Sequence, residues 1–279
     1  MGLPTLLRKG ALLPGMGEKQ ADLDKYIAVN YILEWFDKRI NNPNDVKSVN
    51  DRIMVIESAT GSGKSTTLPT EIYLKFNKQL RGNIIVTQPR VLTTISIPNT
   101  IANIDSYKKE NRSDGYGIEF GKNIGYATKE YVKKPLEKGI LFCTIGVLLQ
   151  YLKNMDREVF LKKYRIIMLD EAHDRSLNLD VIFYYMKQLF DTSLITECPF
   201  LVIMSATLDV NKYAKYFKTK TIFKVTGTSY PIQDIYLKYD VENVVSSTIE
   251  TIKKIHLDNS TDDISSSDIV VFIPGQSFI

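Results

Sequence analysis

The chain has 279 residues, of which 44% are apolar and 24% charged, and its formal net charge is +4. This is the composition of a globular protein of one or two domains, and the mild basicity is compatible with a polyanion partner without requiring one. The two cysteines and two histidines have no metal-type spacing, so a zinc site is not expected. The cysteines are expected to be reduced thiols in a reducing intracellular compartment. No apolar run approaches the roughly 18 residues of a membrane span, so no membrane partner is expected.

The first 40 residues divide into an arm and a helix. Residues 1–20 contain several prolines and glycines, which predicts an irregular N-terminal arm. Apolar residues then recur at helical spacing over 21–40, and this predicts a helix that covers the edge of a sheet, with a partner-binding helix as the alternative. The segment 41–44, which includes Pro43, ends it.

A phosphate-binding loop is predicted next. The apolar run 53–56 leads into Ser-Ala-Thr-Gly-Ser-Gly-Lys-Ser-Thr at 58–66, and a helix-compatible run follows to Asn77. Strand, glycine turn, Lys-Ser and helix form the pattern whose backbone N–H groups face phosphates. Lys64 would reach the β and γ phosphates and Ser65 would bind Mg²⁺. Ser58 stands where the pattern has its first glycine, which is acceptable if this residue needs no positive φ. A plain Gly/Ser turn at a helix start is the alternative. The predicted nucleotide-binding residues are Thr60, Gly61, Ser62, Gly63, Lys64, Ser65 and Thr66.

Apolar runs and helical patterns alternate through the next 150 residues. Continuous apolar strands alternating with helices predict an α/β fold in which a mostly parallel sheet is covered on both faces. Pro98 is expected to kink or shorten its helix. The strands are predicted at 83–87, 124–128, 139–144, 164–169, 200–204 and 221–225, and the helices at 91–104, 145–153 and 177–190.

Polar motifs follow three of these strands, namely Gln-Pro-Arg at 88–90, Asp-Glu-Ala-His at 170–173 and Ser-Ala-Thr at 205–207. Because the carboxyl ends of parallel strands meet at one edge of a sheet, these motifs and the phosphate loop are expected to form one site. Asp170 and Ser65 would hold Mg²⁺, Asp170 through water, and Glu171 would polarise the attacking water. Taken alone, Asp-Glu after a strand is also a common helix N-cap.

Two further roles are expected at this edge. His173 would hydrogen-bond toward Ser205 or Thr207 and so couple the nucleotide site to the neighbouring strand. Basic and hydroxyl side chains at strand ends could bind a sugar-phosphate backbone without reading bases, although solvated basic loops are the alternative. The candidate nucleic-acid contacts are Arg90, Thr128, Lys129 and Thr144.

The C-terminal 50 residues differ in pattern. A linker at 226–231 precedes a predicted strand at 232–239, a helix at 241–255, a polar loop at 258–268 and a buried strand at 268–276. This order predicts the incomplete start of a second α/β domain. The expected organisation is therefore an arm at 1–20, a nucleotide-binding domain at 21–228 and the start of a second domain at 229–279.

These motifs together resemble the first motor domain of a DEAH-box superfamily 2 helicase. The resemblance rests on Asp-Glu-Ala-His with its continuation to Asp180, on the loop 60–65, and on the segments 87–90, 125–126, 205–207 and 271–276. The nearest branch is the DEAH helicases of large cytoplasmic DNA viruses, including the nucleoside triphosphate phosphohydrolases of poxviruses. Thr-Ile-Gly at 144–146 departs from the family's Thr-Asp-Gly, so one strand-side contact is expected to be lost or altered.

The resemblance implies a RecA-like fold and the start of a second RecA-like domain. It further implies motion on RNA or DNA in the 3′-to-5′ direction, driven by ATP or another nucleoside triphosphate with Mg²⁺, and the host cytoplasm or the virion as the location. Its partners would be single-stranded RNA or DNA and a second motor domain or accessory protein. Because the family's arginine fingers lie in the second domain, these 279 residues are expected to bind nucleotide, to turn over slowly and not to unwind.

Two other functions are compatible with the sequence. A P-loop kinase would share the phosphate loop, but it would need an acceptor pocket and a lid, and it gives no role to Ser-Ala-Thr. A non-enzymatic motor fragment that binds nucleic acid or a partner is the other alternative. The intact Lys64, Asp170 and Glu171 argue against decay of the site.

Overall fold

The computed structural model describes residues 18–58, 62–206, 210–225, 234–237, 240–241, 243–258 and 269–272. The chain divides into two compact units, residues 1–229 and residues 230–279, which are described separately. None of the described helices combines the length and the apolar character that a bilayer span requires.

The first unit is built on one sheet, whose described strands number eight and lie in the order β4-β3-β5-β2-β6-β7-β1-β8. All neighbouring pairs are parallel except β3 with β4. This confirms the predicted mostly parallel α/β fold. The strands are β1 (Ile53–Ser58), β2 (Asn83–Gln88), β3 (Ile124–Ala127), β4 (Val132–Lys133), β5 (Ile140–Thr144), β6 (Tyr164–Leu169), β7 (Phe200–Ser205) and β8 (Ile222–Val225).

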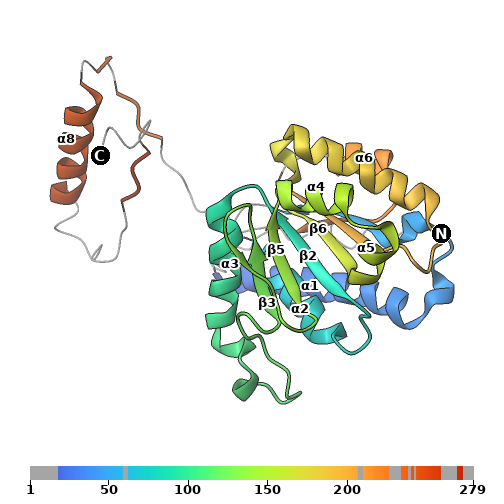
Figure 1. Cartoon of the computed structure of the whole chain (residues 1–279). Helices are drawn as coiled ribbons and strands as arrows, with labels where there is room; N and C mark the ends of the chain where they lie inside the picture. The colour runs from blue at the N-terminus through green and yellow to red at the C-terminus, as the bar shows by residue number, and fades with distance from the viewer. Residues whose placement is uncertain are drawn as a thin grey trace. The chain divides into compact units, whose positions relative to one another are not determined.

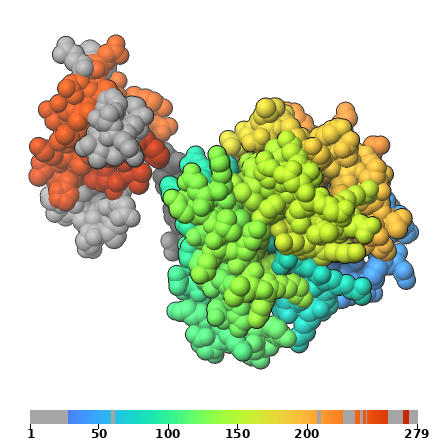
Figure 2. Space-filling model, viewed as in Figure 1, coloured from blue at the N-terminus to red at the C-terminus, as the bar shows by residue number. Residues whose placement is uncertain are grey.

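Helices cover both faces of this sheet (Figure 1). Helices α1, α2 and α3 pack on one face, and α4, α5, α6 and α7 pack on the other. Figure 2, drawn from the same side, shows side chains covering the strands that are visible in Figure 1. The helices of this unit are α1 (Glu18–Asn41), α2 (Thr67–Phe76), α3 (Val91–Asn103), α4 (Ile145–Asn154), α5 (Arg157–Lys163), α6 (Leu177–Thr192) and α7 (Val210–Tyr216).

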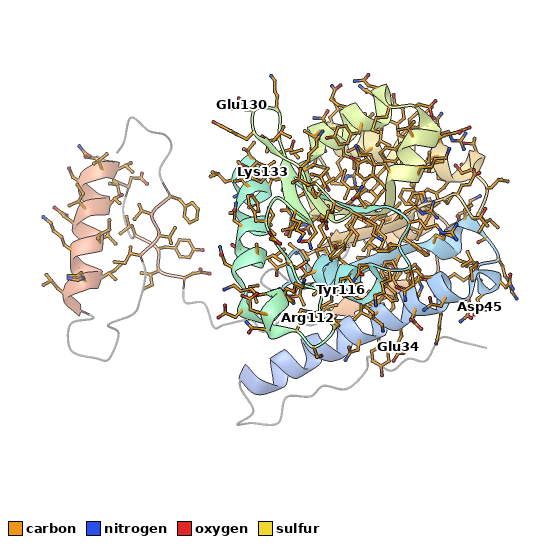
Figure 3. All side chains as sticks on the ribbon, turned by 60° about the horizontal axis from the view of Figure 1, so that its bottom comes forward. Glu34, Asp45, Arg112, Tyr116, Glu130 and Lys133 are labelled. Carbon is orange, nitrogen blue, oxygen red and sulfur yellow. The ribbon has the colours of Figure 1, made fainter. Side chains whose placement is uncertain are left out.

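Alternate residues of each central strand enter opposite hydrophobic clusters. In β1, Ile53 and Val55 join the cluster under α4 and α6, while Met54 and Ile56 join the cluster under α1 and α2. Successive side chains of a strand point to opposite faces, so a strand buried on both faces has to be apolar throughout. The two clusters therefore explain why the strands read as continuous apolar runs. Figure 3 shows Glu34 and Glu130, which lie outside these clusters, at the exterior of the unit.

One strand and two α-helices of the first unit were not predicted, and Pro98 does not shorten its helix. The short strand β4 and helices α5 and α7 lie in segments that were left unassigned. Helix α3 runs through Pro98 to Asn103 instead of being shortened by it. Residues 18–20, expected in the arm, belong to α1, and residues 1–17 lie outside the described residues.

The second unit is described only in part. Its helix α8 (Val244–Asp258) matches the predicted helix. The predicted strands at 232–239 and 268–276 are wrong where they can be compared, because 234–237 and 269–272 form no strand and Phe272 is exposed. A strand needs hydrogen-bonding neighbours, and none of the described residues of this unit forms a ladder. The rest of both predicted strands, the linker 226–231 and most of the loop 258–268 lie outside the described residues.

Candidate active site

The sheet order places the motifs on neighbouring strand ends. β6 lies beside β7, and β7 beside β1, with Leu169 opposite Ile203 and Glu57 opposite Ser205. The motifs that follow β6 and β7 and the loop that follows β1 therefore meet at the carboxyl edge of the sheet. This is the edge at which open parallel sheets bind ligands.

The described part of the phosphate loop has the expected backbone. Gly63 has φ +76°, a conformation that residues with a Cβ rarely adopt. Its carbonyl accepts the Thr67 N–H at 2.7 Å and the Thr66 N–H at 3.2 Å, which leads the chain into α2. Ser62 is buried beside it. Thr60 and Gly61, also predicted to bind nucleotide, lie outside the described residues.

Ser58 fits the position where the pattern has glycine. It is the last residue of β1, pairs with Val225 of β8, and does not have a positive φ. Its buried hydroxyl contacts the hydroxyl of Ser62 across the loop. A serine at this position therefore adds a contact within the loop and requires no unusual backbone.

Lys64 and Glu171 form an ion pair at the centre of the site. The Lys64 Nζ atom lies 3.1 Å from Glu171 Oε1, and the lysine side chain is 6% exposed. The second carboxylate oxygen, Glu171 Oε2, is buried and receives no hydrogen bond from the described residues. The two predicted catalytic groups are thus paired with each other. Glu171 Oε2 is left as an acceptor for a small donor such as water.

Asp170 precedes Glu171 in the chain and is fully buried. Its Oδ2 accepts a 2.7 Å hydrogen bond from the Gln88 amide, and its Oδ1 accepts the Glu171 N–H at 2.9 Å. Burial raises the pKa of the Asp170 carboxyl, while hydrogen bonds from Ser65 and Gln88 and the charge of Lys64 oppose that shift. A carboxylate and a hydroxyl side by side are oxygen ligands of the kind that Mg²⁺ takes, so Ser65 and Asp170 fit the predicted metal site.

The turn after Asp170 is conformationally strained. Glu171 and Arg175 both have positive φ, +51° and +47°, on either side of the single 3₁₀ turn Ala172–Asp174. Non-glycine residues in this region cost about 1–3 kcal/mol each and concentrate at functional sites. The turn is fixed from outside by the Tyr213 hydroxyl, which donates a 2.7 Å hydrogen bond to the Ala172 carbonyl.

His173 reaches the Ser-Ala-Thr motif, as the sequence indicated, but at a different atom. Its Nδ1 accepts the Ala206 N–H at 3.4 Å and lies 3.3 Å from Glu171 Oε2. The expected partners were the hydroxyls of Ser205 or Thr207. Ser205 ends β7 and is buried, and Thr207 lies outside the described residues.

The candidate nucleic-acid contacts lie at the carboxyl ends of β2, β3 and β5, which are neighbouring strands. Arg90 and Lys129 are exposed, and Thr144 is partly exposed at the start of α4. Thr128 is only 3% exposed, and its hydroxyl exchanges hydrogen bonds with the backbone of Tyr131. The geometry thus offers three accessible groups, whereas Thr128 shapes the turn between β3 and β4.

Two features of this edge were not foreseen. Gln88 was predicted only as part of the polar motif at 88–90, whereas its amide donates a hydrogen bond to Asp170. A polar residue at the end of a buried apolar strand is a signal for such a role. Ile145, which replaces the family's aspartate, is buried in the cluster under α4 and α6. In this chain that position serves the hydrophobic core.

The parallel sheet, the phosphate loop on β1 and the acidic pair on β6 define a RecA-like P-loop domain. The model of the DEAD/DEAH box helicase family matches residues 45–216, and the chain belongs to this family. It is 32% identical over its whole length to the African swine fever virus protein B962L, which carries the name of an RNA helicase, and it spans 30% of that protein. It is also 35% identical, over 82% of its length, to the ATP-dependent RNA helicase HrpA of Borreliella burgdorferi, of which it spans 26%.

Proposed function

We propose that the first unit binds ATP or another nucleoside triphosphate with Mg²⁺ and hydrolyses it, as the motor of a DEAH-type helicase that moves 3′-to-5′ on RNA or DNA. The observation that carries this is the Lys64–Glu171 ion pair next to the buried Asp170. RNA as the strand is supported by the names of the similar proteins from African swine fever virus and Borreliella burgdorferi.

In the proposed reaction, the phosphates of the nucleotide compete with Glu171 for the Lys64 ammonium. When Lys64 turns to the β and γ phosphates, Glu171 loses its partner and both of its carboxylate oxygens become acceptors. A water hydrogen-bonded to this carboxylate would be oriented and would pass a proton to it while attacking the γ phosphorus. The bond from the γ phosphorus to the β–γ bridging oxygen would break, and the nucleoside diphosphate and phosphate would leave. Mg²⁺ held by Ser65 and Asp170 would neutralise charge on the phosphate oxygens.

Coupling to nucleic acid would pass through the ends of β6 and β7. His173 contacts both the Glu171 carboxylate and the backbone of Ala206. A displacement of the motif at 205–207 would therefore move His173 and change the position of the catalytic carboxylate. We assign Ser205 and Thr207 to this coupling. Arg90, Lys129 and Thr144 would contact the sugar-phosphate backbone, with Thr128 supporting the turn.

A second motor domain or an accessory protein is the proposed partner. The ion pair occupies Glu171 Oε1 and holds Lys64 away from phosphate until it opens, which supports slow turnover by the 279 residues alone. The buried free thiols Cys143 and Cys198 and the viral relative support a reducing location, the host cytoplasm or the virion.

Binding of Mg²⁺ and ATP and release of phosphate, measured with and without single-stranded RNA, test the proposal. Lys64→Ala is expected to abolish nucleotide binding, and Glu171→Gln to keep binding while turnover falls by a factor of about 10² or more. Lys122→Ala and Glu119→Gln are matched controls, because they break an exposed ion pair in the turn before β3.

Three results would contradict the proposal. Turnover by Glu171→Gln equal to that of the unmodified chain would remove Glu171 from the reaction. Phosphorylation of a metabolite in place of RNA-stimulated hydrolysis would favour a kinase. RNA binding without any turnover, with or without a partner, would favour a non-enzymatic module.

A further inference from the structure

A basic surface lies at the amino edge of the sheet, opposite the nucleotide site. A cavity of about 420 Å³ opens at the starts of β5, β2 and β6, and Glu137 is the one carboxylate among its described lining residues. A second cavity, of about 320 Å³, shares Arg81 with the first and has no carboxylate among the described residues that line it. We call these cations the basic amino edge: Arg39, Arg52, Arg81, Lys134, Lys138, Lys162, Lys163 and Arg165.

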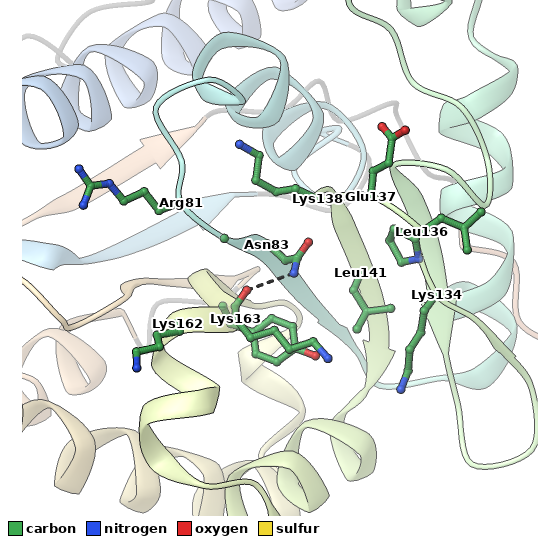
Figure 4. Close-up of a pocket in the computed structure, with 12 residues that line it drawn as sticks. Arg81, Asn83, Lys134, Leu136, Glu137, Lys138, Leu141, Lys162 and Lys163 are labelled. Carbon is green, nitrogen blue, oxygen red and sulfur yellow. Dashed lines mark hydrogen bonds between the residues drawn. The ribbon is translucent and has the colours of Figure 1, made fainter.

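The topology gathers these residues from distant parts of the chain. Arg52, Arg81, Lys138 and Lys163 each lie one or two residues before a strand, namely before β1, β2, β5 and β6. These strands and β7 are consecutive in the sheet order β5-β2-β6-β7-β1 and run parallel. Figure 4 shows Arg81, Lys134, Lys138 and Lys162 on different sides of Asn83 and Leu141. With a rise of about 3.3 Å per residue, six-residue strands separate this edge from the phosphate loop by roughly 20 Å.

The positive charge of the basic amino edge is only partly compensated. Of its eight cations, only Lys162 forms an ion pair with a carboxylate among the described residues, an exposed pair with Glu158 at 3.5 Å. Asp51 and Asp45 interact electrostatically with Arg39, and Glu197 with Arg165, without forming an ion pair. Lys138 and Arg165 donate hydrogen bonds to loop carbonyls, which satisfy donors but cancel no charge. Such a surface attracts an anion that brings several charges at once.

Arg52 is a buried cation of this edge with one unsatisfied hydrogen-bond donor among the described residues. It is 5% exposed, its Nη1 donates to the Cys198 carbonyl at 3.0 Å, and its buried Nε finds no hydrogen-bond acceptor among the described residues. Burial, together with the neighbouring Arg165, lowers the pKa of the Arg52 guanidinium to about 10. A buried cation beside a second cation is costly unless an anion approaches. An anion in the cavity that both arginines line would offset this cost.

We propose that the basic amino edge is a second nucleic-acid site, which binds the phosphodiester backbone of RNA outside the path at the carboxyl edge. Neighbouring strands lie about 4.8 Å apart, so the starts of five strands extend over roughly 19 Å. This length suits a polyanion with regularly spaced charges better than a single phosphate. The accessible groups are flexible lysines and guanidinium groups, which contact phosphates without reading bases.

The test uses RNA alone, so that it does not depend on the proposed motor activity. Binding of a fluorescent single-stranded RNA of 20 nucleotides is measured over a range of KCl concentrations without nucleotide. The variant carries Arg81→Gln, Lys134→Gln and Lys162→Gln, all at exposed positions. The matched control carries Lys109→Gln, Lys153→Gln and Lys215→Gln, which are also exposed and line neither cavity.

Three lost phosphate contacts are expected to reduce the slope of log K against log [salt] by about 2, and to weaken binding roughly tenfold or more at low salt. The control variant should keep both values. Turnover of ATP without RNA should be the same in all three proteins. If turnover is absent in all of them and stays absent with RNA and a partner, the proposed motor function fails, whereas the RNA titrations still decide the second site.

Two results would overturn the inference. The first is a salt slope for the triple variant equal to that of the control, with binding lost instead in Arg90→Gln with Lys129→Gln. The second is displacement of the RNA by poly-glutamate as efficiently as by unlabelled RNA at equal charge concentration, which would assign the edge to an acidic protein.

Discussion

The hydrogen bond between Gln88 and Asp170 gives a direct test of how the site is built. Gln88 Nε2 lies 2.7 Å from Asp170 Oδ2, and the two side chains are 3% and 0% exposed. Gln88→Ala removes this donor from a buried carboxylate that cannot turn to bulk water. Asp170 keeps the N–H of Glu171 and the Ser65 hydroxyl, so the carboxylate would be less well satisfied and less firmly oriented.

A hydrogen bond to a charged group contributes about 1.5–3 kcal/mol, and leaving a buried partner unsatisfied costs a similar amount. For a unit of about 200 residues, each kcal/mol corresponds to a shift of about 2–4 °C in the unfolding temperature. Gln88→Ala is therefore expected to lower that temperature by roughly 3–12 °C. Because the same carboxylate would hold Mg²⁺, the Mg²⁺-dependent part of nucleotide affinity should fall by a factor of roughly ten or more.

Thermal unfolding, and titration with a fluorescent ATP analogue with and without Mg²⁺, measure the two effects. Gln150→Ala serves as the control, because Gln150 is exposed and bonds only to Asn154 among the described residues. Gln88→Glu should be worse than Gln88→Ala, since it sets a second buried carboxylate against the first. A melting temperature for Gln88→Ala equal to that of the control would refute the reasoning.

Three further predictions concern the same unit. Gly63→Ala should destabilise the fold by about 1–2 kcal/mol and weaken ATP binding, because φ is +76° at this position. Denaturant unfolding and ATP titration measure the two effects, and an unchanged midpoint of unfolding would contradict this prediction. Thr219→Val removes the hydroxyl that donates to the Ile53 carbonyl at 2.6 Å and should cost about 1–3 kcal/mol; a cost below 0.5 kcal/mol would disprove it. Burial raises the pKa of the Cys143 and Cys198 thiols, so a thiol-specific disulfide reagent should label neither at pH 8 until the protein unfolds; rapid native labelling would count against their burial.

Much of the first unit could be predicted because its signals are local. A strand covered on both faces has to be apolar along its whole length. For this reason the predicted bounds of β6, 164–169, agree with the observed strand. Strand β4, which was missed, lacks such a signal. β4 has two exposed residues and exists only through its pairing with β3. Helix α5 did have a start signal, since the Asp156 side chain caps the N–H groups of Glu158 and Val159.

The same local reasoning fails where a structure depends on partners. The run 269–272 has the composition of a buried strand, but its described residues are exposed and form no ladder. At the site, the phosphate loop and the acidic pair were predicted from the order of the motifs at strand ends. The Lys64–Glu171 ion pair and the Gln88 contact could not be predicted, because they depend on the sheet order, which places β2 and β7 on either side of β6.

The division of the interior into two separate apolar layers has a consequence for how such a chain can diverge. Since the sheet separates the layers, substitutions in the cluster under α6 do not require compensating substitutions in the cluster under α2. Free-energy changes at sites without shared partners usually add, so each layer can drift on its own while the strand backbones keep their spacing. A family member could thus exchange most of one layer, and retain the positions of the loop on β1 and the carboxylates on β6, as long as the other layer holds the sheet in register.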